Sequence, residues 1–375
     1  MKIVIDDKIP YINGAFEKVA EVIYLPGSKT TPEIVKNADA IVTRTRTICN
    51  EQLLAGSSVK FIATATIGYD HIDTDYCDVT GIKWTNAPGC NSMSVEQYIA
   101  SALMVLAETK NLKLNELCIG VVGVGNVGSK VARLCELLGM KVLLNDPPRQ
   151  RAEGGDEFVS LDYIKENANI ITLHVPLNMK GEDVTYHLAD KSFFETLSNK
   201  PVLINSCRGE VVETIAVKEA LKSGRISDFV CDCWENEPDI DLELLAMTAL
   251  ATPHIAGYSK DGKATGTKMS VQAINDFFDL GLNNWQPSGV ELPSLPLIEI
   301  DGKELNEQQI ISKAILHTYD IRKDDSLFRS KPSDFEKQRG DYPTRREFPA
   351  YSIKANDIPE ITINKLKLLG FNTNN

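Results

Sequence analysis

A run of three closely spaced glycines, set between a strand-like and a helix-like segment, constrains the fold of this chain more than any other feature. The run Gly-Val-Gly-Asn-Val-Gly at 123–128 directly follows LCIGVV at 117–122 and directly precedes SKVARLCELLG at 129–139. This order of strand, turn and helix is the first half of a βαβ unit, whose strands lie parallel in one sheet. The sequence therefore predicts an α/β fold with a parallel sheet that helices cover on both faces.

The same glycines are suited to binding a dinucleotide. Gly123 permits a tight turn, Gly125 removes the side chain that would block a pyrophosphate, and Gly128 lets the helix approach the strand closely. The amide groups and dipole at the start of the helix favour the charge of the phosphates. An ordinary glycine turn is the alternative for the pattern taken alone. The residues of this loop that we predict to bind the cofactor are Gly123, Gly125, Asn126, Val127 and Gly128.

An acidic residue at the end of the next strand supports the dinucleotide site. Asp146 ends the segment KVLLND at 141–146, eighteen positions after Gly128. A carboxylate there accepts hydrogen bonds from both ribose hydroxyls of an adenosine and repels a 2′-phosphate. Two prolines follow it, so no arginine stands in the next position, although Arg149 and Arg151 are near. The sequence therefore favours NAD over NADP.

The rest of the chain repeats the βα pattern and then changes character. A domain boundary is expected near 95–115, and the Pro-rich stretch at 284–296 resembles a linker. Long helices are expected at 94–109 and 270–278, and a last part of the chain has a helix at 306–319. The predicted strands are 2–6, 21–26, 39–44, 60–66, 117–123, 141–146, 170–176, 201–207, 228–234 and 296–301.

Composition and charge exclude several classes of protein. A formal net charge of -12 disfavours a nucleic-acid partner, which would need clustered Lys and Arg. The start of the chain lacks the apolar core of a signal peptide, and apolar runs such as 99–107 are too short to span a bilayer. The eight cysteines include no C-x-x-C pair, and Cys231 and Cys233 have no second ligand pair nearby. We expect a cytoplasmic protein with reduced thiols and neither metal nor membrane partner.

Three polar residues follow later strands, where ligands of open parallel sheets bind. They are Arg208 in INSCRGEVV, Glu237 in CDCWENEP and His254 in TPHIAGY. Oxidation of a hydroxy acid by hydride transfer needs a cation for the carboxylate, a base for the hydroxyl proton and a group that orients the base. Each residue alone could be an ordinary surface or turn residue, but together they supply all three roles.

The whole set resembles the D-isomer-specific 2-hydroxyacid dehydrogenase family. Its fingerprints are the glycine run, N-[ST]-x-R-G, D-x-x-x-x-E-P and T-P-H-x-[AG]-G, and all of them occur here in the order and spacing of the family. The resemblance implies two Rossmann-like doubly wound lobes with mainly parallel sheets plus a smaller C-terminal α+β domain. The implied domains are a substrate-binding lobe at 1–94 completed by 257–285, an NAD-binding lobe at 95–256, and a C-terminal dimerisation domain at 286–375.

Within the family, the chain is most similar to a branch that oxidises a small phosphorylated hydroxy acid at C2. The segment FEKQRGDYPTRREF at 335–348 is its most specific part, since ordinary members lack this C-terminal domain. The resemblance implies that His254 takes the hydroxyl proton, that Glu237 hydrogen-bonds the imidazole, and that Arg208 holds the carboxylate. It further implies a homodimer. The other implied contacts are Thr45, Thr66 and Tyr258 with substrate, and Asp146, Val175, Asp232 and Gly257 with NAD, Val175 through its backbone alone.

The phosphate of such a substrate needs a local cluster of cations. Arg44 and Arg46 follow a predicted strand, and residues two apart on an extended segment project to the same side. We predict that both bind substrate, the alternative being two solvated surface arginines. A second hypothesis is that Arg345 and Arg346 add charge from a partner subunit.

Two other functions stay open at this point. One is another D-2-hydroxyacid dehydrogenase, of the phosphoglycerate or hydroxypyruvate type, with the same three residues and a different pocket. The other is a non-enzymatic NAD-sensing corepressor, which the intact triad and the lack of a DNA-binding segment disfavour. The remaining histidines have no motif role, and we expect His71, His174, His187 and His317 to be structural.

Overall fold

The computed structural model describes residues 1–374, which form two compact units. Unit 1 consists of Met1–Asn91 and Ser259–Glu291, and unit 2 consists of Ser92–Tyr258 and the chain from Leu292 onward. The C-terminal residues thus belong to the same compact unit as the glycine loop. Within the described residues, no helix has both the length and the apolar character needed to cross a membrane.

Unit 1 is built on a five-stranded parallel sheet in the order β2-β1-β3-β4-β5. Buried aliphatic side chains form a separate core on each face of the sheet. The strands are β1 (Lys2–Asp6), β2 (Glu21–Leu25), β3 (Ala40–Thr43), β4 (Phe61–Thr64) and β5 (Lys83–Thr85), and the helices are α1 (Pro32–Val35), α2 (Glu51–Leu54), α3 (Thr74–Thr80) and α11 (Lys260–Phe278).

Helix α11 begins ten residues before the predicted segment at 270–278. The Ser259 side chain caps it by accepting a hydrogen bond from the Gly262 amide at 2.8 Å. A Cβ on Gly266 would lie 2.8 Å from the carbonyl oxygen of Ala65, so this glycine allows the helix to pack closely against the chain after β4. Because glycines required by packing weaken the apolar periodicity, the sequence pattern does not reveal the first half of the helix.

Unit 2 contains a six-stranded parallel sheet in the order β11-β10-β9-β8-β6-β7. The chain passes from β7 back across β6 to β8, so the order reverses beside the carboxyl end of β6, where ligands of such sheets bind. The strands are β6 (Cys118–Val122), β7 (Lys141–Asn145), β8 (Ile170–Leu173), β9 (Val202–Asn205), β10 (Asp228–Cys231) and β11 (Leu250–Ala251). The helices are α4 (Ser92–Lys110), α5 (Gly128–Leu137), α6 (Pro147–Glu153), α7 (Leu161–Asn167), α8 (Lys191–Glu195), α9 (Thr214–Lys222) and α10 (Leu242–Met247).

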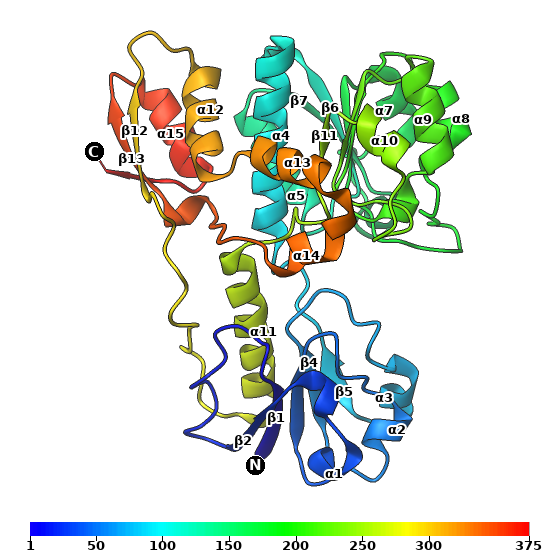
Figure 1. Cartoon of the computed structure of the whole chain (residues 1–375), viewed down its shortest axis with the longest axis vertical. Coiled ribbons are helices and arrows are strands. Elements are labelled where there is room, and N and C mark those ends of the chain that lie inside the picture. The colour runs from blue at the N-terminus through cyan, green and yellow to red at the C-terminus, as the bar shows by residue number, and fades with distance from the viewer. Residues whose placement is uncertain (375) are drawn as a thin grey trace. The chain divides into compact units, whose positions relative to one another are not determined.

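The C-terminal part of unit 2 has its own three-stranded sheet, ordered β12-β13-β14, with both pairings parallel. Helices α12 and α13 pack against the long buried helix α4, and their side chains join the core of the large sheet (Figure 1). The elements are β12 (Leu297–Asp301), α12 (Glu307–Thr318), α13 (Ile321–Ser330), α14 (Phe335–Gly340), β13 (Ser352–Asn356), α15 (Glu360–Leu368) and β14 (Asn372–Asn374).

The predicted fold class is confirmed. Each of the ten predicted strands contains an observed strand, and the small C-terminal domain mixes helices with a sheet of its own. The eight cysteines are free thiols, seven of them buried, as their positions in apolar runs predicted. The role of residues 286–375 in dimerisation stays a prediction.

Candidate active site

The glycine loop has the shape that a dinucleotide needs. Gly123 has φ +87°, and a Cβ there would lie 2.7 Å from the carbonyl group of His174, the residue before Val175. A Cβ on Gly128 would overlap the carbonyl oxygen of Gly123. At Gly125, by contrast, no protein atom lies within 4 Å of the Cβ position. Packing therefore requires the first and third glycines, while the second leaves open space beside the N-terminus of α5 for a phosphate.

Asp146 lies at the carboxyl end of β7, where its carboxylate accepts hydrogen bonds from the amides of Val124 at 2.8 Å and Arg149 at 3.0 Å. It thereby joins the glycine loop to the start of α6. The Arg149 guanidinium is held by both carboxylate oxygens of Glu153, at 2.8 and 2.6 Å, and by the Val124 carbonyl at 2.7 Å. The arginine that could have bound a 2′-phosphate is thus already paired, which favours NAD.

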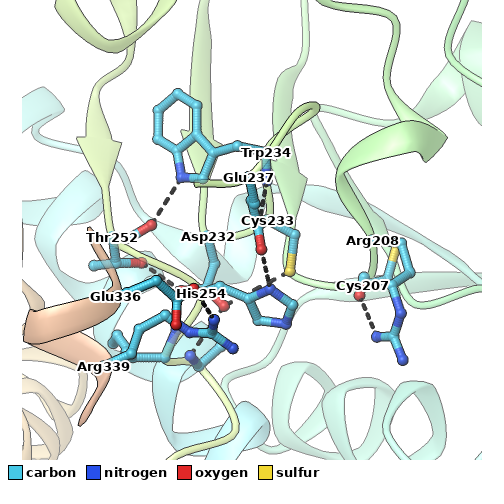
Figure 2. A network of polar contacts seen from close by, with 12 residues as sticks. Cys207, Arg208, Asp232, Cys233, Trp234, Glu237, Thr252, His254, Glu336 and Arg339 are labelled. Carbon is cyan, nitrogen blue, oxygen red and sulfur yellow. Dashed lines mark hydrogen bonds and ion pairs between the residues drawn. The ribbon is translucent and has the colours of Figure 1, made fainter. Parts of the chain in front are cut away.

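His254 and Glu237 form a hydrogen-bonded pair (Figure 2). Nδ1 of the imidazole lies 2.7 Å from Oε2 of Glu237, whose Oε1 accepts the Trp234 amide at 2.8 Å. An ionised carboxylate can only accept hydrogen bonds, so Nδ1 carries the proton and Nε2 presents a lone pair. No residue in 1–374 makes a hydrogen bond to Nε2 of His254. The imidazole is therefore oriented as a base whose free nitrogen can take a proton.

The peptide groups after His254 are held from both sides by buried charges. The Asp232 carboxylate accepts the amides of Ile255 at 2.7 Å and Ala256 at 2.9 Å, together with the Thr252 hydroxyl at 2.7 Å. The Arg345 guanidinium donates to the carbonyl oxygens of the same residues, Ile255 at 3.4 Å and Ala256 at 2.6 Å. These opposed contacts, here called the Asp232–Arg345 clamp, fix the backbone that carries His254.

Both charges of the clamp are removed from water. Asp232 is 1% exposed, and its burial raises the pKa of the carboxyl, an effect that His254 and the hydrogen bonds to the carboxylate oppose. Arg345 is 4% exposed and stacks 4.3 Å from the centre of the Tyr319 ring. The hypothesis that Arg345 supplies charge from a partner subunit is wrong, because the side chain is buried within its own chain. Contact between Asp232 and NAD stays a prediction.

Arg208 follows β9 on a loop that lies against the loop of Glu237. Its side chain is exposed, with Nη1 donating to the Cys207 carbonyl at 2.7 Å. A Cβ on the next residue, Gly209, would overlap the peptide between Trp234 and Glu235, so only glycine permits this approach. The close approach brings Arg208 to the same end of the sheet as His254, without a contact between them (Figure 2).

The other predicted substrate residues except Tyr258 lie in unit 1, after β3 and β4. Arg44, Thr45 and Arg46 line one cavity of about 380 Å³, together with Lys8. The Thr66 hydroxyl lies after the neighbouring strand and donates to the Gly68 carbonyl at 2.9 Å. Asp6 also lines this cavity, and Nη1 of Arg44 donates to the Lys8 carbonyl at 3.0 Å. Substrate binding by Arg44 and Arg46 stays a prediction.

A cation that the sequence reasoning missed stands near Arg44. Burial and then the charges of Arg44 and Lys260 lower the pKa of Lys263, and the charge of Glu291 opposes this shift. Arg44, Lys260 and Lys263 are thus close enough for their charges to interact, and neighbouring cations favour an anionic ligand. Lys263 lies on α11, in the stretch KDGKATG that the helical pattern did not reveal.

Cys233, Glu237 and His254 place one ligand-type atom each within 4.8 Å of one another. Their chemistry argues against a metal. Burial raises the pKa of the Cys233 thiol well above its ordinary value, and that thiol lies 3.8 Å from an Asp232 oxygen as a hydrogen-bond donor. A metal would need the thiolate instead.

All four remaining histidines were expected to be structural, and three of them make hydrogen bonds within the chain. His174 lies 2.9 Å from the Thr172 hydroxyl, and burial lowers the pKa of its ring to about 3. His187 pairs with Glu235 at 2.7 Å, and His317 with the Leu295 carbonyl at 3.0 Å. His71 is buried, and its Nε2 has no hydrogen-bond partner within the described chain.

Comparison with known proteins agrees with this geometry. Residues 95–256 match the NAD binding domain of D-isomer specific 2-hydroxyacid dehydrogenases, and residues 292–370 match a domain of unknown function, DUF3410. The chain is 54% identical over 94% of its length to erythronate-4-phosphate dehydrogenase of Bacteroides thetaiotaomicron, of which it covers 99%. The chain belongs to the D-isomer specific 2-hydroxyacid dehydrogenase family. The predicted NAD cofactor and dehydrogenase activity are thereby confirmed.

Further relatives identify the branch of this family. Identity is 42% to erythronate-4-phosphate dehydrogenase of Porphyromonas gingivalis, covering 94% of this chain and 95% of that protein. It is 40% to the enzyme of the same name from Proteus mirabilis, covering 99% of both. The branch indicated by the sequence is that of the erythronate-4-phosphate dehydrogenases, and these relatives confirm it.

Solved structures share the fold. D-lactate dehydrogenase from Aquifex aeolicus, complexed with NAD and lactic acid, has a TM-score of 0.58 and 27% identity and covers 78% of this chain and 100% of its own. D-2-hydroxyisocaproate dehydrogenase has a TM-score of 0.60 at 22% identity, covering 77% of this chain and 100% of its own, which shows the fold alone.

The contacts of Asp146 predict the outcome of a substitution that removes its charge and keeps its hydrogen bond to the helix. Asp146→Ser retains an oxygen that can cap α6 but loses the carboxylate that repels a 2′-phosphate. We expect weaker NAD binding and a smaller preference for NAD over NADP, with thermal stability nearly unchanged. Measured dissociation constants for both cofactors test this, and an unchanged ratio would mean that another residue reads the ribose.

The Asp232–Arg345 clamp predicts a second outcome. Arg345→Met keeps the apolar contact with Tyr319 but removes the hydrogen bonds to the loop, which we expect to cost about 3 kcal/mol of stability. Displacement of His254 should lower kcat by about 10²-fold. Denaturant unfolding and steady-state kinetics measure both, with the exposed Lys337→Met as a control. Full activity in folded Arg345→Met would contradict a role in positioning His254.

Proposed function

We propose that this chain oxidises 4-phospho-D-erythronate at C2 to 2-oxo-3-hydroxy-4-phosphobutanoate, a step in the synthesis of pyridoxal 5′-phosphate (vitamin B6). The observation that carries the proposal is the His254–Glu237 pair, hydrogen-bonded at 2.7 Å at the same sheet end as Arg208 and the glycine loop. The 54% identical relative that bears the name of this activity supports the choice of substrate.

The residues divide the reaction between them. Nε2 of His254 takes the proton of the C2 hydroxyl, and the Glu237 carboxylate stabilises the imidazolium that forms. Arg208, exposed at the loop after β9, binds the substrate carboxylate and polarises the forming carbonyl group. NAD, when bound, would supply the acceptor for the hydride that leaves C2. The residues that would hold NAD are Gly123, Gly125, Asn126, Val127, Gly128, Asp146, Val175, Asp232 and Gly257.

The other residues that we propose to bind substrate are Thr45 and Thr66, through their hydroxyl groups, and Tyr258. Arg44 and Arg46 bind the phosphate, supported by the cavity that they share and by the positive charge near Lys263.

Homodimer formation through residues 286–375, which the resemblance to the family branch implies, and a cytoplasmic location, which the sequence led us to expect, are further parts of the proposal. Light scattering of the purified protein tests the first. The alternatives for the reaction are a phosphoglycerate or hydroxypyruvate type of dehydrogenase and, as a different class, an NAD-sensing corepressor. The oriented base supports an enzyme over a sensor.

An absorbance assay of NADH formation tests the function directly. Purified protein and NAD are supplied with 4-phospho-D-erythronate, D-erythronate, phosphoglycerate or glycerate, each with and without 2-oxoglutarate as a possible acceptor of electrons from NADH. We expect the highest kcat/KM with 4-phospho-D-erythronate, and His254→Ala should lower turnover by about 10²–10⁴-fold. A clear preference for phosphoglycerate would favour the first alternative, and no turnover of any acid would favour the sensor.

The two contacts of Glu237 predict the effect of removing its charge alone. In Glu237→Gln the amide oxygen can still accept the Trp234 N–H, but the amide group cannot stabilise an imidazolium. We expect kcat to fall by about 10²–10⁴-fold while NAD affinity and melting temperature stay close to wild type. Single-turnover kinetics measure the chemical step, and a normal rate there would remove Glu237 from the mechanism.

The shared cavity predicts a substrate-selective effect for Arg44. Arg44→Ala should raise KM for 4-phospho-D-erythronate about tenfold or more and hardly change it for D-erythronate, because a charge-assisted bond is lost with the phosphate alone. Lys36→Ala, at an exposed position of the same unit, serves as the control. Equal effects on both acids would place Arg44 at the carboxylate end or away from the substrate.

A further inference from the structure

A third arginine stands beside the His254–Glu237 pair, and it comes from the C-terminal domain. Arg339 lies on α14, close enough to Glu237 for the two charges to interact. In the view of Figure 2, Arg339 projects on one side of the imidazole and Arg208 on the other. Its side chain is 23% exposed, so it is largely buried but reaches solvent. All of these residues belong to unit 2. The reacting histidine therefore has one guanidinium on each side.

Aromatic rings hold the Arg339 guanidinium in place. Its central carbon lies 5.7 Å from the centre of the Phe335 ring and 5.9 Å from that of Tyr258, a predicted substrate residue. Such contacts orient a guanidinium and leave its N–H donors available, because they involve the face of the ring rather than a hydrogen bond. The aromatic rings thus position Arg339 without using its N–H donors.

The polar partners of Arg339 are fewer than a buried guanidinium requires. Nη1 donates to Oε1 of Glu336 at 2.7 Å, but the Glu336 side chain is 66% exposed, and such surface pairs contribute little. Nε is buried without a hydrogen-bond partner in residues 1–374. Arg329, in the preceding helix, instead bonds to Asp325, Leu245 and Thr248. An unsatisfied buried donor is costly, so the hydrogen-bonding capacity of this guanidinium is not met within the described chain.

The electrostatic surroundings keep this guanidinium charged. Burial opposes the charge, but Tyr258, Glu336 and Glu237 outweigh it and raise the pKa of Arg339. Glu237 is already hydrogen-bonded to His254 and the Trp234 amide, so it does not neutralise Arg339 directly. Arg339 therefore presents a full positive charge beside the reacting imidazole.

Two cations on opposite sides of a base match a substrate with an anion at each end and the reacting carbon between. In the proposed substrate, C2 lies between the C1 carboxylate and the phosphate on C4. With the carboxylate at Arg208 and the C2 hydroxyl at His254, the phosphate end extends away from Arg208. We propose that Arg339 of the C-terminal domain binds the substrate phosphate and so helps to select a phosphorylated acid.

This inference rests on the proposed function, but its evidence is independent of Arg44 and Arg46, which lie in unit 1. A phosphate group has three terminal oxygens and accepts several charge-assisted hydrogen bonds, so more than one arginine can bind it. The inference also gives the C-terminal domain a place in the active site of its own chain.

The test compares Arg339→Met, which keeps the length and the aromatic contacts, with Arg339→Lys, which keeps the charge. We expect Arg339→Met to raise KM for 4-phospho-D-erythronate by about 10- to 100-fold and to change kcat/KM for D-erythronate by less than about threefold. Arg339→Lys should recover part of the loss. NAD affinity, measured by fluorescence quenching, should stay the same in both variants.

Two matched variants of the same helix show whether the effect belongs to Arg339 alone. Lys337→Met removes an exposed charge two residues away, and Glu336→Gln removes the ion-pair partner, and both should leave the preference for the phosphorylated acid unchanged. An equal loss with both substrates, or a loss in Glu336→Gln as large as in Arg339→Met, would mean that Arg339 maintains structure and would overturn the inference.

Direct binding separates this inference from the proposed reaction. If wild-type protein fails to oxidise 4-phospho-D-erythronate, the proposed function fails, and calorimetric titration with inorganic phosphate then decides on Arg339. Weaker phosphate binding in Arg339→Met than in wild type and Lys337→Met supports the site. Equal phosphate binding in all three proteins overturns it.

Discussion

The buried carboxylate of Asp232 is the group on which the catalytic end of the large sheet depends. Removing an ionised carboxylate from water is unfavourable by several kcal/mol unless hydrogen bonds replace the lost water. The Thr252 hydroxyl and the amides of Ile255 and Ala256 supply them, so the chain after β11 wraps around this one side chain. His254 lies within that wrap at φ +55°, a backbone conformation that non-glycine residues rarely adopt. Asp232 therefore fixes the backbone that carries the base, while Glu237 orients the imidazole ring.

Close backbone approaches complete the arrangement. Gly209 lets the Arg208 loop lie on the peptide after Trp234, and Gly123 lets the cofactor loop lie on the peptide after His174. A methyl group at either position would push two catalytic segments apart. Because the backbone is more rigid than side chains, these backbone contacts fix the loops of the site firmly relative to the strands of the sheet.

The C-terminal domain contributes residues that contact the loop of His254. Arg345 donates hydrogen bonds to the carbonyl groups of Ile255 and Ala256, whose amides donate to Asp232. Helix α14 carries Arg339 close enough to Glu237 for the two charges to interact. The added domain can therefore change both the rigidity of the loop and the charge that a substrate meets.

The sequence by itself determined the parallel sheets and the glycine loop, and it predicted the three residues that we propose to carry the reaction. These follow from local patterns: apolar runs of strand length, glycines at fixed spacing, and polar residues directly after strands. The first half of α11 was missed because glycines needed for packing against Ala65 interrupt the helical pattern. The sequence did not indicate the roles of Arg345, Arg339 and Lys263 either, since an arginine or lysine in a polar segment is expected to be exposed to solvent. Only the tertiary structure decided which of these cations are buried and what they face. Burial and charge pairing depend on the packing of segments that are distant in the sequence, such as those of Arg345 and Ile255, which are 90 residues apart.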